Sequence, residues 1–431
     1  MNNTIGESIS RLYTFAGADL TTISYPSDVS LGIAKGVWQL LEDGIQVLNQ
    51  KESLAEKIAY LGTCYTRGVQ AYDADENIHA SIRQIADDIY QKNDTEAYKI
   101  YLQTRDLNIE YFKEVTKRLG SDFDDFIFES EAGVVGKELV LSHVPDVYTE
   151  SDGAIIYEGE QDGLHTRVFI NKDGNPTYEA KDTGLLKLKF DRYAPDLSVF
   201  VTDSQQGPYF QVVKKAAGKI NKQWEEKTIH ATHGRMQFKG EKMSSRLGNT
   251  PLAADILDVV NQEAQERAGE RQLNTEQADD ISLAALKYSI LRTQAGKDMN
   301  FDPETSLSFE GDSGPYLQYT HARSISLLNK AQAAGISISD QQPDDWSTTD
   351  LERYLYRFPE VAELAAQERH PHIVVGYITE LAQLFNTWYS STKIIDTDDA
   401  HSSYKLALVK ATAQIISNGL WLLGIKAPTE M

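Results

Sequence analysis

The sequence predicts an α/β domain followed by an all-α bundle. Residues 197–202 form a compact apolar run that ends in a polar turn, and a helical pattern begins at residue 209. That order is typical of a buried strand and its crossover helix in a doubly wound sheet, whose ligands bind at the carboxyl ends of the strands. Beyond about residue 250 the strand signals fade, and apolar residues recur at helical spacing in 374–389 and 406–423. These long amphipathic stretches predict a helical bundle.

The first half of the chain has the pattern of an α/β domain with two insertions. Apolar spacing predicts helices at residues 5–13, 33–49 and 53–119 and a short strand at 20–25. From about residue 138 to 178, short β-rich runs alternate with the pairs Asp152-Gly153, Asp162-Gly163 and Asp173-Gly174. Asp-Gly supplies the positive φ angles of tight hairpin turns, so we expect an inserted antiparallel meander.

Composition narrows the class of protein. A chain of 431 residues with 41% hydrophobic content can form two or three domains with proper cores. There is no run of 18 apolar residues, and the first residues lack the pattern of a secretory signal. The single cysteine, Cys64, excludes an internal disulfide and a cysteine metal site, and we expect it to be a small buried hydrophobe. A cytoplasmic protein without a membrane segment fits these features.

The charge balance limits how a nucleic acid can bind. The chain carries 64 acidic and 42 basic residues, for a net charge of -22. Such a chain is not expected to bind a partner through a diffuse basic surface. An RNA partner would therefore need lysines and arginines concentrated on one face.

The strongest local signal lies at residues 240–249, with the sequence Gly-Glu-Lys-Met-Ser-Ser-Arg-Leu-Gly-Asn. Backbone N–H groups of such a loop, together with Lys242, suit a polyphosphate and the charge that develops on leaving pyrophosphate. Composition alone leaves a solvated surface loop as the alternative.

Lys-Met-Ser-Ser-Arg followed by Gly-Asn resembles the second signature of class I aminoacyl-tRNA synthetases, in the form typical of the arginine enzymes. The class pattern has a second lysine where this chain has Ser245, and many arginine enzymes share that departure. The block 309–323 looks like the segment that joins the catalytic domain to the anticodon-binding bundle in arginyl-tRNA synthetases, and residues 419–431 are similar to the end of that bundle. The resemblance implies a Rossmann-like catalytic domain and catalytic roles for Lys242, Ser244, Ser245 and Arg246.

The resemblance also implies which residues bind arginine. Tyr178 and Asp182 match the family's Tyr-x-x-x-Asp, in which the carboxylate pairs with the substrate guanidinium and the tyrosine packs against it. Gln206 matches the family glutamine that completes this site. The family usually has a histidine three residues later, where this chain has Tyr209. Without the resemblance, Asp182 would be an ordinary residue at the start of a helix.

For ATP, the resemblance points to His230, His233 and Gly234, together with Lys242 and Met243 of the loop. As isolated residues, the two histidines would more often be polar turn residues. None of the nine histidines stands in a metal-ligand pattern such as His-Glu-x-x-His, so we expect no structural metal.

The implied organisation has three parts. They are an incomplete catalytic domain at 1–250, a helical connecting region at 251–300 and an anticodon-binding domain at 301–431. The catalytic domain contains a helical insertion at about 50–120 and a β-rich insertion at about 138–178. Aromatic and basic side chains of that last domain are candidates to stack on unpaired tRNA bases, namely Arg323, Trp388 and Tyr389. Trp388 and Tyr389 are more often core residues.

Class I synthetases hold ATP with a first signature, His-x-Gly-His, which does not occur in these 431 residues. In the arginine enzymes it precedes a segment that residues 2–8 resemble, so we expect the chain to begin just after it and to lack the family's N-terminal domain. An internal methionine taken as the start, or a broken or split gene, is the favoured explanation. The alternatives are a non-catalytic relative that binds tRNA, and a separate polypeptide that supplies the missing part. We expect little arginine activation by the chain alone.

The resemblance implies an ATP-dependent arginine–tRNA ligase, and two alternatives remain beside it. Its substrates are arginine, tRNA(Arg) and ATP with Mg²⁺, and we expect a monomer. The alternatives are a tRNA-binding module without catalysis and a class I synthetase for another amino acid.

Overall fold

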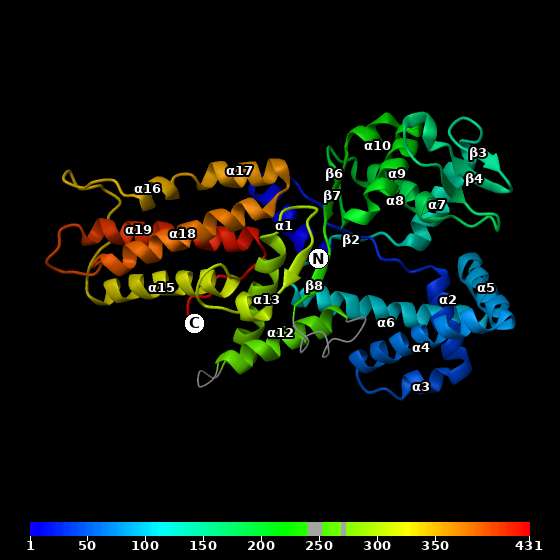
Figure 1. The fold of residues 1–431 in the computed structure, drawn as a ribbon, viewed down its shortest axis with the longest axis horizontal. Helices are drawn as coiled ribbons and strands as arrows, with labels where there is room; N and C mark the ends of the chain where they lie inside the picture. The colour runs from blue at the N-terminus through cyan, green and yellow to red at the C-terminus, as the bar shows by residue number, and fades with distance from the viewer. Residues whose placement is uncertain (240–251, 269–272) are drawn as a thin grey trace.

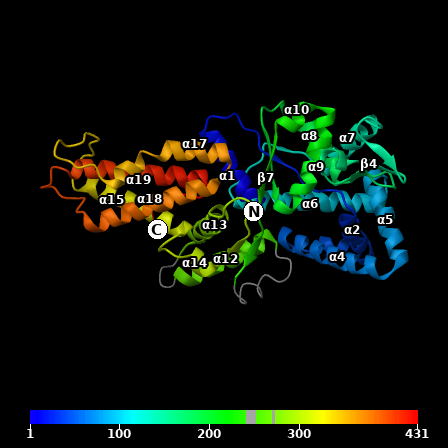
Figure 2. The ribbon, with the colours of Figure 1, turned by 45° about the horizontal axis from the view of Figure 1, so that its top comes forward.

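The structure is a computed structural model that describes residues 1–239, 252–268 and 273–431. An elongated helical bundle occupies one end of the molecule, and an α/β part and a second group of helices occupy the other (Figure 1). The N-terminus lies in the middle of the molecule, where these ends meet, and the C-terminus lies beside the bundle; a view turned by 45° shows the same separation (Figure 2). The arrangement confirms the predicted order of an α/β domain and a helical bundle.

Two pairs of parallel strands form the centre of the α/β part. β1 (Ile23–Ser24) pairs with β2 (Asp125–Phe126), and β6 (Ser198–Asp203) pairs with β7 (Thr228–His233) over its full length. Helix α9 (Gly207–Ile220) lies between β6 and β7 in the chain, which confirms the predicted strand and crossover helix. The strand predicted at 20–25 is shorter than expected, because only two of its residues pair with β2.

Between β1 and β2 the chain forms a group of helices with its own core. These helices are α2 (Leu31–Asp43), α3 (Ile45–Asn49), α4 (Leu54–Ala74), α5 (Glu76–Gln91) and α6 (Glu96–Arg118). The helix predicted at 33–49 is divided in two, because Gly44 adopts a φ of 84° and ends α2. Cys64 is fully buried among these helices, which confirms its role as a small hydrophobe.

The predicted meander is a three-stranded antiparallel sheet, composed of β3 (Thr149–Ser151), β4 (Ala154–Tyr157) and β5 (Arg167–Ile170). Asp152 and Gly153 both have positive φ and form the tight turn between β3 and β4, as predicted. The second pair is different, because Asp162 and Gly163 end a 3₁₀ turn in a longer connection. The β-rich segment also begins later than predicted, since residues up to Ser142 belong to α7 (Glu129–Ser142).

Helix α8 (Tyr178–Tyr193) packs closely on α7, and two glycines make this approach possible. A Cβ on Gly136 would lie 1.8 Å from the carbonyl oxygen of Ala180, and one on Gly184 would lie 2.0 Å from that of Ala132. Any larger residue would push the helices apart. This contact fixes the position of α8, which carries the predicted arginine-binding residues.

Helices α12 (Ala253–Ala268) and α13 (Thr275–Leu291) lie between the α/β part and the bundle (Figure 1). The bundle consists of α15 (Gly314–Ala333), α16 (Asp350–Leu355), α17 (Phe358–Glu368), α18 (Pro371–Ser391) and α19 (Ser402–Leu422). One hydrophobic core joins α13 to the bundle and extends to Leu12 of α1 (Asn2–Phe15). None of the helices in the described ranges is long and apolar enough to cross a membrane.

One pair of strands lies where the sequence predicts none. β8 (Met236–Phe238) pairs in parallel with β9 (Met299–Phe301). β9 lies beyond residue 250, in the part of the sequence where strand signals fade. Each strand has only three residues, too few for alternation of apolar and polar side chains to be recognised. The pairing ties the end of the α/β part to the segment that follows α13.

Candidate amino-acid and nucleotide site

Asp182 lies at the centre of the predicted arginine site. Tyr178 begins α8 and Asp182 follows one turn later, so both side chains project from one face of the helix. From α9, the hydroxyl of Tyr209 donates a hydrogen bond of 2.5 Å to Asp182 Oδ2. The position that departs from the family histidine therefore contacts the predicted carboxylate directly.

The protein holds Asp182 in an environment that disfavours its charge. Burial raises the pKa of its carboxyl to about 7, the hydrogen bond from Tyr209 opposes this rise, and the nearby carboxylates of Glu129 and Glu179 add to it. The side chain is only partly exposed to solvent. A guanidinium would supply the positive charge and the paired N–H donors that this carboxylate lacks.

Tyr178 and Lys181 occupy neighbouring positions on the same helix. Tyr178 is 57% exposed, so its side chain is accessible to a planar cation. Lys181 is 3% exposed; its Nζ lies 5.2 Å from the Tyr178 ring centre and 3.0 Å from Glu129 Oε2. It also donates a hydrogen bond of 3.0 Å to the carbonyl of Val29. This buried lysine, which the sequence did not single out, connects α8, α7 and the segment after β1.

Gln206 lies at the carboxyl end of β6, where the sequence places a ligand-binding turn. It ends a 3₁₀ turn and its side chain is exposed. Asp203 at the end of β6 accepts a hydrogen bond of 2.8 Å from the Gln205 amide and lies 3.6 Å from Arg235. No hydrogen bond joins Gln206 to Asp182 within the described residues.

The two predicted ATP-site histidines lie in strand β7 and not in a turn. His230 Nε2 lies 2.7 Å from the hydroxyl of Thr202 on β6, and its ring centre lies 4.4 Å from that of Phe210. Burial lowers the pKa of His230, and the charge of Lys214 lowers it further. A neutral imidazole is therefore expected at this position near neutral pH.

His233 ends β7, and its ring contacts the first helix of the chain. Its Nδ1 lies 2.6 Å from the Gly234 carbonyl oxygen, and its Nε2 lies against Asn2 Oδ1. Gly234 allows the chain to pass close to Lys297, because a Cβ there would lie 2.3 Å from that residue's carbonyl carbon. The contacts bring residues 2, 233 and 297 together at one edge of the α/β part.

The signature loop lies outside the described residues. The candidates Lys242, Met243, Ser244, Ser245 and Arg246 fall in the gap between residues 239 and 252. The flanking elements are β8 and α12.

The tRNA-binding candidates meet between α15 and α18. The guanidinium carbon of Arg323 lies 4.7 Å from the ring centre of Tyr319 and 5.2 Å from that of Tyr389. Arg323 also donates a hydrogen bond of 2.7 Å to Asn386 Oδ1. Trp388 is partly buried and packs against the bundle core. Arg323 and Tyr389 thus form one cluster, and Trp388 lies beside it.

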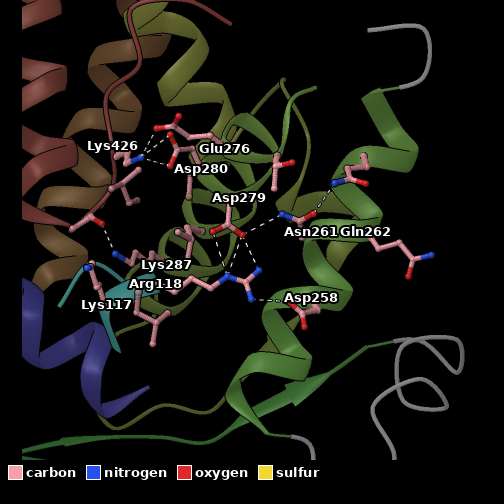
Figure 3. Close-up of a pocket in the computed structure, with 18 residues that line it drawn as sticks. Lys117, Arg118, Asp258, Asn261, Gln262, Glu276, Asp279, Asp280, Lys287 and Lys426 are labelled. Atoms are coloured by element: carbon pink, nitrogen blue, oxygen red, sulfur yellow. Dashed lines mark hydrogen bonds and ion pairs between the residues drawn. The ribbon is translucent and has the colours of Figure 1, made fainter. Parts of the chain in front are cut away.

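A separate cavity of about 800 Å³ lies between the end of α6, α12, α13 and the C-terminal segment (Figure 3). Its charged groups largely pair with one another. Arg118 donates to Asp279 at 2.8 Å and to Asp258 at 2.6 Å, and Lys426 lies 2.8 Å from Asp280 (Figure 3). Of the predicted site residues that lie in the described ranges, none lines this cavity. No group of side chains in the described ranges has the composition of a metal site.

Comparison with known proteins identifies the family. The family model for the class I tRNA synthetase (R) catalytic domain matches residues 2–302, and that for the DALR anticodon binding domain matches residues 317–431. An arginine–tRNA ligase of Porphyromonas gingivalis is 27% identical over 465 residues, which cover 100% of this chain and 77% of that protein. One of Bacteroides thetaiotaomicron is 31% identical over 335 residues, which cover 74% of this chain and 56% of that protein.

The fold agrees with these matches. The solved structure of Thermus thermophilus arginyl-tRNA synthetase superposes with a TM-score of 0.79 at 23% identity, covering 99% of this chain and 79% of that chain. The catalytic-domain match alone spans more than half of the 431 residues. The chain therefore belongs to the arginine branch of the class I aminoacyl-tRNA synthetases, and carries that family's catalytic and anticodon-binding domains.

Proposed function

We propose that this chain contributes the amino-acid site of an arginine–tRNA ligase. In the first step, the carboxylate of arginine attacks the α-phosphate of ATP in line, which forms arginyl-adenylate and releases pyrophosphate. In the second step, the terminal adenosine of tRNA(Arg) attacks the adenylate, which forms arginyl-tRNA and releases AMP. Positioning and electrostatic stabilisation supply most of the rate in such a reaction.

One observation supports arginine above all: Asp182 is a largely enclosed carboxylate with tyrosines around it and no cationic partner among the described residues. Its carboxylate would take the guanidinium side-on, and the exposed ring of Tyr178 would cover the planar face of that group. Gln206, exposed at the start of α9, would bind the polar end of the amino acid. A neutral or anionic side chain would leave Asp182 without a counter-charge.

ATP would bind as its Mg²⁺ complex along the edge formed by β7. His230, His233 and Gly234 would line the nucleotide, since they follow one another along the end of that strand. Lys242 and Met243, with Ser244, Ser245 and Arg246, would hold the pyrophosphate side, where a lysine and backbone N–H groups offset the developing charge.

The bundle would bind the anticodon arm of tRNA. Arg323 and Tyr389 present a cation between two aromatic rings, a combination that suits stacking on an unpaired base, with Trp388 alongside. We propose catalytic, connecting and anticodon-binding domains at 1–250, 251–300 and 301–431, with insertions at about 50–120 and 138–178. A monomer in the cytoplasm fits a translation enzyme whose one cysteine is buried and reduced.

Arginine binding is the decisive readout, because it depends on Asp182 and not on the first ATP signature, which the 431 residues do not contain. Titration calorimetry should show binding of arginine but not of citrulline. Asp182→Asn should weaken binding by about 100-fold or more, because a charge-assisted bidentate pair is lost. Asp191→Asn is the matched control on the same helix, since Asp191 is exposed and, among the described residues, forms an ion pair with Lys187 alone. Equal affinity of wild type and Asp182→Asn for arginine would refute the proposal.

A further inference from the structure

Tyr25 lies directly after β1, at the carboxyl end of a parallel strand. Its ring packs against the hydrophobic cluster of Ile127, Ala132 and Leu185. Its hydroxyl oxygen is buried and has no hydrogen-bond partner in the part of the chain that the structure describes. A buried phenol without a partner is costly, so this group calls for an explanation.

The Tyr25 hydroxyl faces the same carboxylate as Tyr209 does. Burial raises the pKa of Tyr25 well above its ordinary value, and the charges of Asp182 and Glu129 raise it further. The Tyr25 hydroxyl lies close enough to Asp182 to lower the pKa of that carboxyl as a hydrogen-bond donor does, although the geometry of the contact falls short of a hydrogen bond. The phenol is therefore neutral at any physiological pH, and it retains both a donor and an acceptor.

The segment that carries Tyr25 is held rigidly. Three residues later, the buried carboxylate of Asp28 accepts hydrogen bonds from the amide and the hydroxyl of Ser130, at 2.8 and 2.7 Å, and from Arg105 at 2.9 Å. The carbonyl of Val29 accepts the hydrogen bond from Lys181. α6, α7 and α8 thus all fix this turn, so the hydroxyl of Tyr25 is positioned before any ligand arrives.

We propose that Tyr25 is a specificity-determining residue of the arginine site, whose hydroxyl oxygen accepts a hydrogen bond from the substrate guanidinium. This inference rests on the proposed function. A guanidinium carries five N–H donors and no acceptor, and Asp182 can take only two of them side-on. Tyr209 already donates its proton to that carboxylate, whereas the Tyr25 hydroxyl has no hydrogen-bond partner among the described residues. The oxygen of Tyr25 offers a further acceptor at the buried end of the site, while its own proton turns toward Asp182.

Tyr25→Phe tests this by removing one oxygen and nothing else. Arginine affinity, measured by calorimetry at constant pH, should fall about 10- to 100-fold, the range for one buried hydrogen bond to a charged group. Tyr148→Phe is the matched control, because the Tyr148 hydroxyl is also buried without a partner but the ring packs against Tyr157 and Phe169 in the meander. Its arginine affinity should equal that of the wild type.

A double-mutant cycle separates ligand contact from a structural role. If Tyr25 and Asp182 share the guanidinium, the loss from Tyr25→Phe should be much smaller when Asp182→Asn is already present. The melting temperature of Tyr25→Phe without ligand should match or exceed that of the wild type, because an unsatisfied hydroxyl is gone. Affinity within twofold of wild type, or weaker binding together with a melting temperature several degrees lower, would overturn the assignment. Failure of the wild type to bind arginine would instead refute the proposed function.

Discussion

Tyr209 donates a hydrogen bond from its hydroxyl to Asp182 Oδ2, at 2.5 Å, across the contact between α9 and α8. Other arginyl-tRNA synthetases usually have a histidine at the position that Tyr209 matches. A phenol at this place offers one proton to the carboxylate and carries no charge, since burial and the nearby Asp182 keep its pKa well above the ordinary value. The phenol thus orients the carboxyl group without bringing a charge of its own, which leaves the counter-charge to a ligand.

The charge state of Asp182 predicts how arginine affinity depends on pH. Burial raises the pKa of this carboxyl to about 7, so the free site is partly protonated at neutral pH. A guanidinium binds the ionised form, so apparent affinity should fall about tenfold for each pH unit below 7 and level off above pH 8. Calorimetry at pH 6, 7 and 8 in buffers of different ionisation enthalpy should also detect release of a proton on binding at pH 6 and 7. An affinity that is constant from pH 6 to 8 would contradict this prediction.

The same carboxyl should make the free protein less stable as pH rises. Its folded pKa of about 7 lies above the ordinary aspartate pKa of 3.8, so the folded state keeps a proton that the unfolded state loses. The stability contribution is present below about pH 4 and is lost as pH rises to 7. Asp182→Asn should therefore raise the melting temperature more at pH 8 than at pH 4.5. Asp191→Asn, on the exposed side of α8, should show no such trend.

Most helices could be predicted from the sequence, because a helix is recognised by apolar spacing among residues that are close along the chain. The stretch at 374–389 lies within α18, and the stretch at 406–423 extends one residue beyond the end of α19 at Leu422; both helices contribute apolar residues to one core. The pairing of β8 with β9 was not predicted, because two three-residue strands about 60 residues apart have no local signature. At Gly44 the sequence predicted helix but not its interruption. The positive φ of Gly44 separates α2 from α3, although the apolar spacing continues on both sides.

The candidate site could be predicted from the sequence only where its residues are close to one another along the chain. Tyr178 and Asp182 share one helix, so their spacing is visible in the sequence. Tyr25 and Lys181 were not singled out, although Pro26 after a short strand marks the place of Tyr25. Their relation to Asp182 depends on the packing of β1, α7 and α8, which no spacing along the chain reveals. The residues of the signature loop stay predictions.

The buried ion pair of Lys181 and Glu129 should be strongly coupled. Their side chains are 3% and 9% exposed and their charged atoms lie 3.0 Å apart. Lys181→Met leaves Glu129 as an unpaired buried charge and should cost about 3–5 kcal/mol of unfolding free energy. Lys181→Met combined with Glu129→Gln should recover a large part of that loss in urea denaturation. Equal losses in the single and the double variant would show that the pair is not coupled.

Arg118 should stabilise the junction of α6 with α12 and α13. It donates to Asp279 through Nε and Nη2 and to Asp258 through Nη1, so three helices share one guanidinium (Figure 3). Arg118→Met should cost about 1–2 kcal/mol, because several charge-assisted hydrogen bonds are lost together. Arg353→Met is the control, since Arg353 pairs with Asp350 at an exposed site and should cost less than about 1 kcal/mol. Equal losses in chemical denaturation would argue against a special role for Arg118.

Gly234 should be indispensable to the edge that carries the histidines. A Cβ at this position would lie 2.3 Å from both the carbonyl carbon and oxygen of Lys297, which cannot move without shifting β9. Gly234→Ala should therefore cost about 1–3 kcal/mol and displace the end of β7, with His233 leaving Asn2. Gly6→Ala is the matched control, because nothing lies within 4 Å of a Cβ there and the residue is inside α1. That change should stabilise the protein by about 0.5–1 kcal/mol, since alanine favours the helix. Thermal melts of the two variants should shift in opposite directions, and a stable Gly234→Ala would show that the backbone at Lys297 can yield.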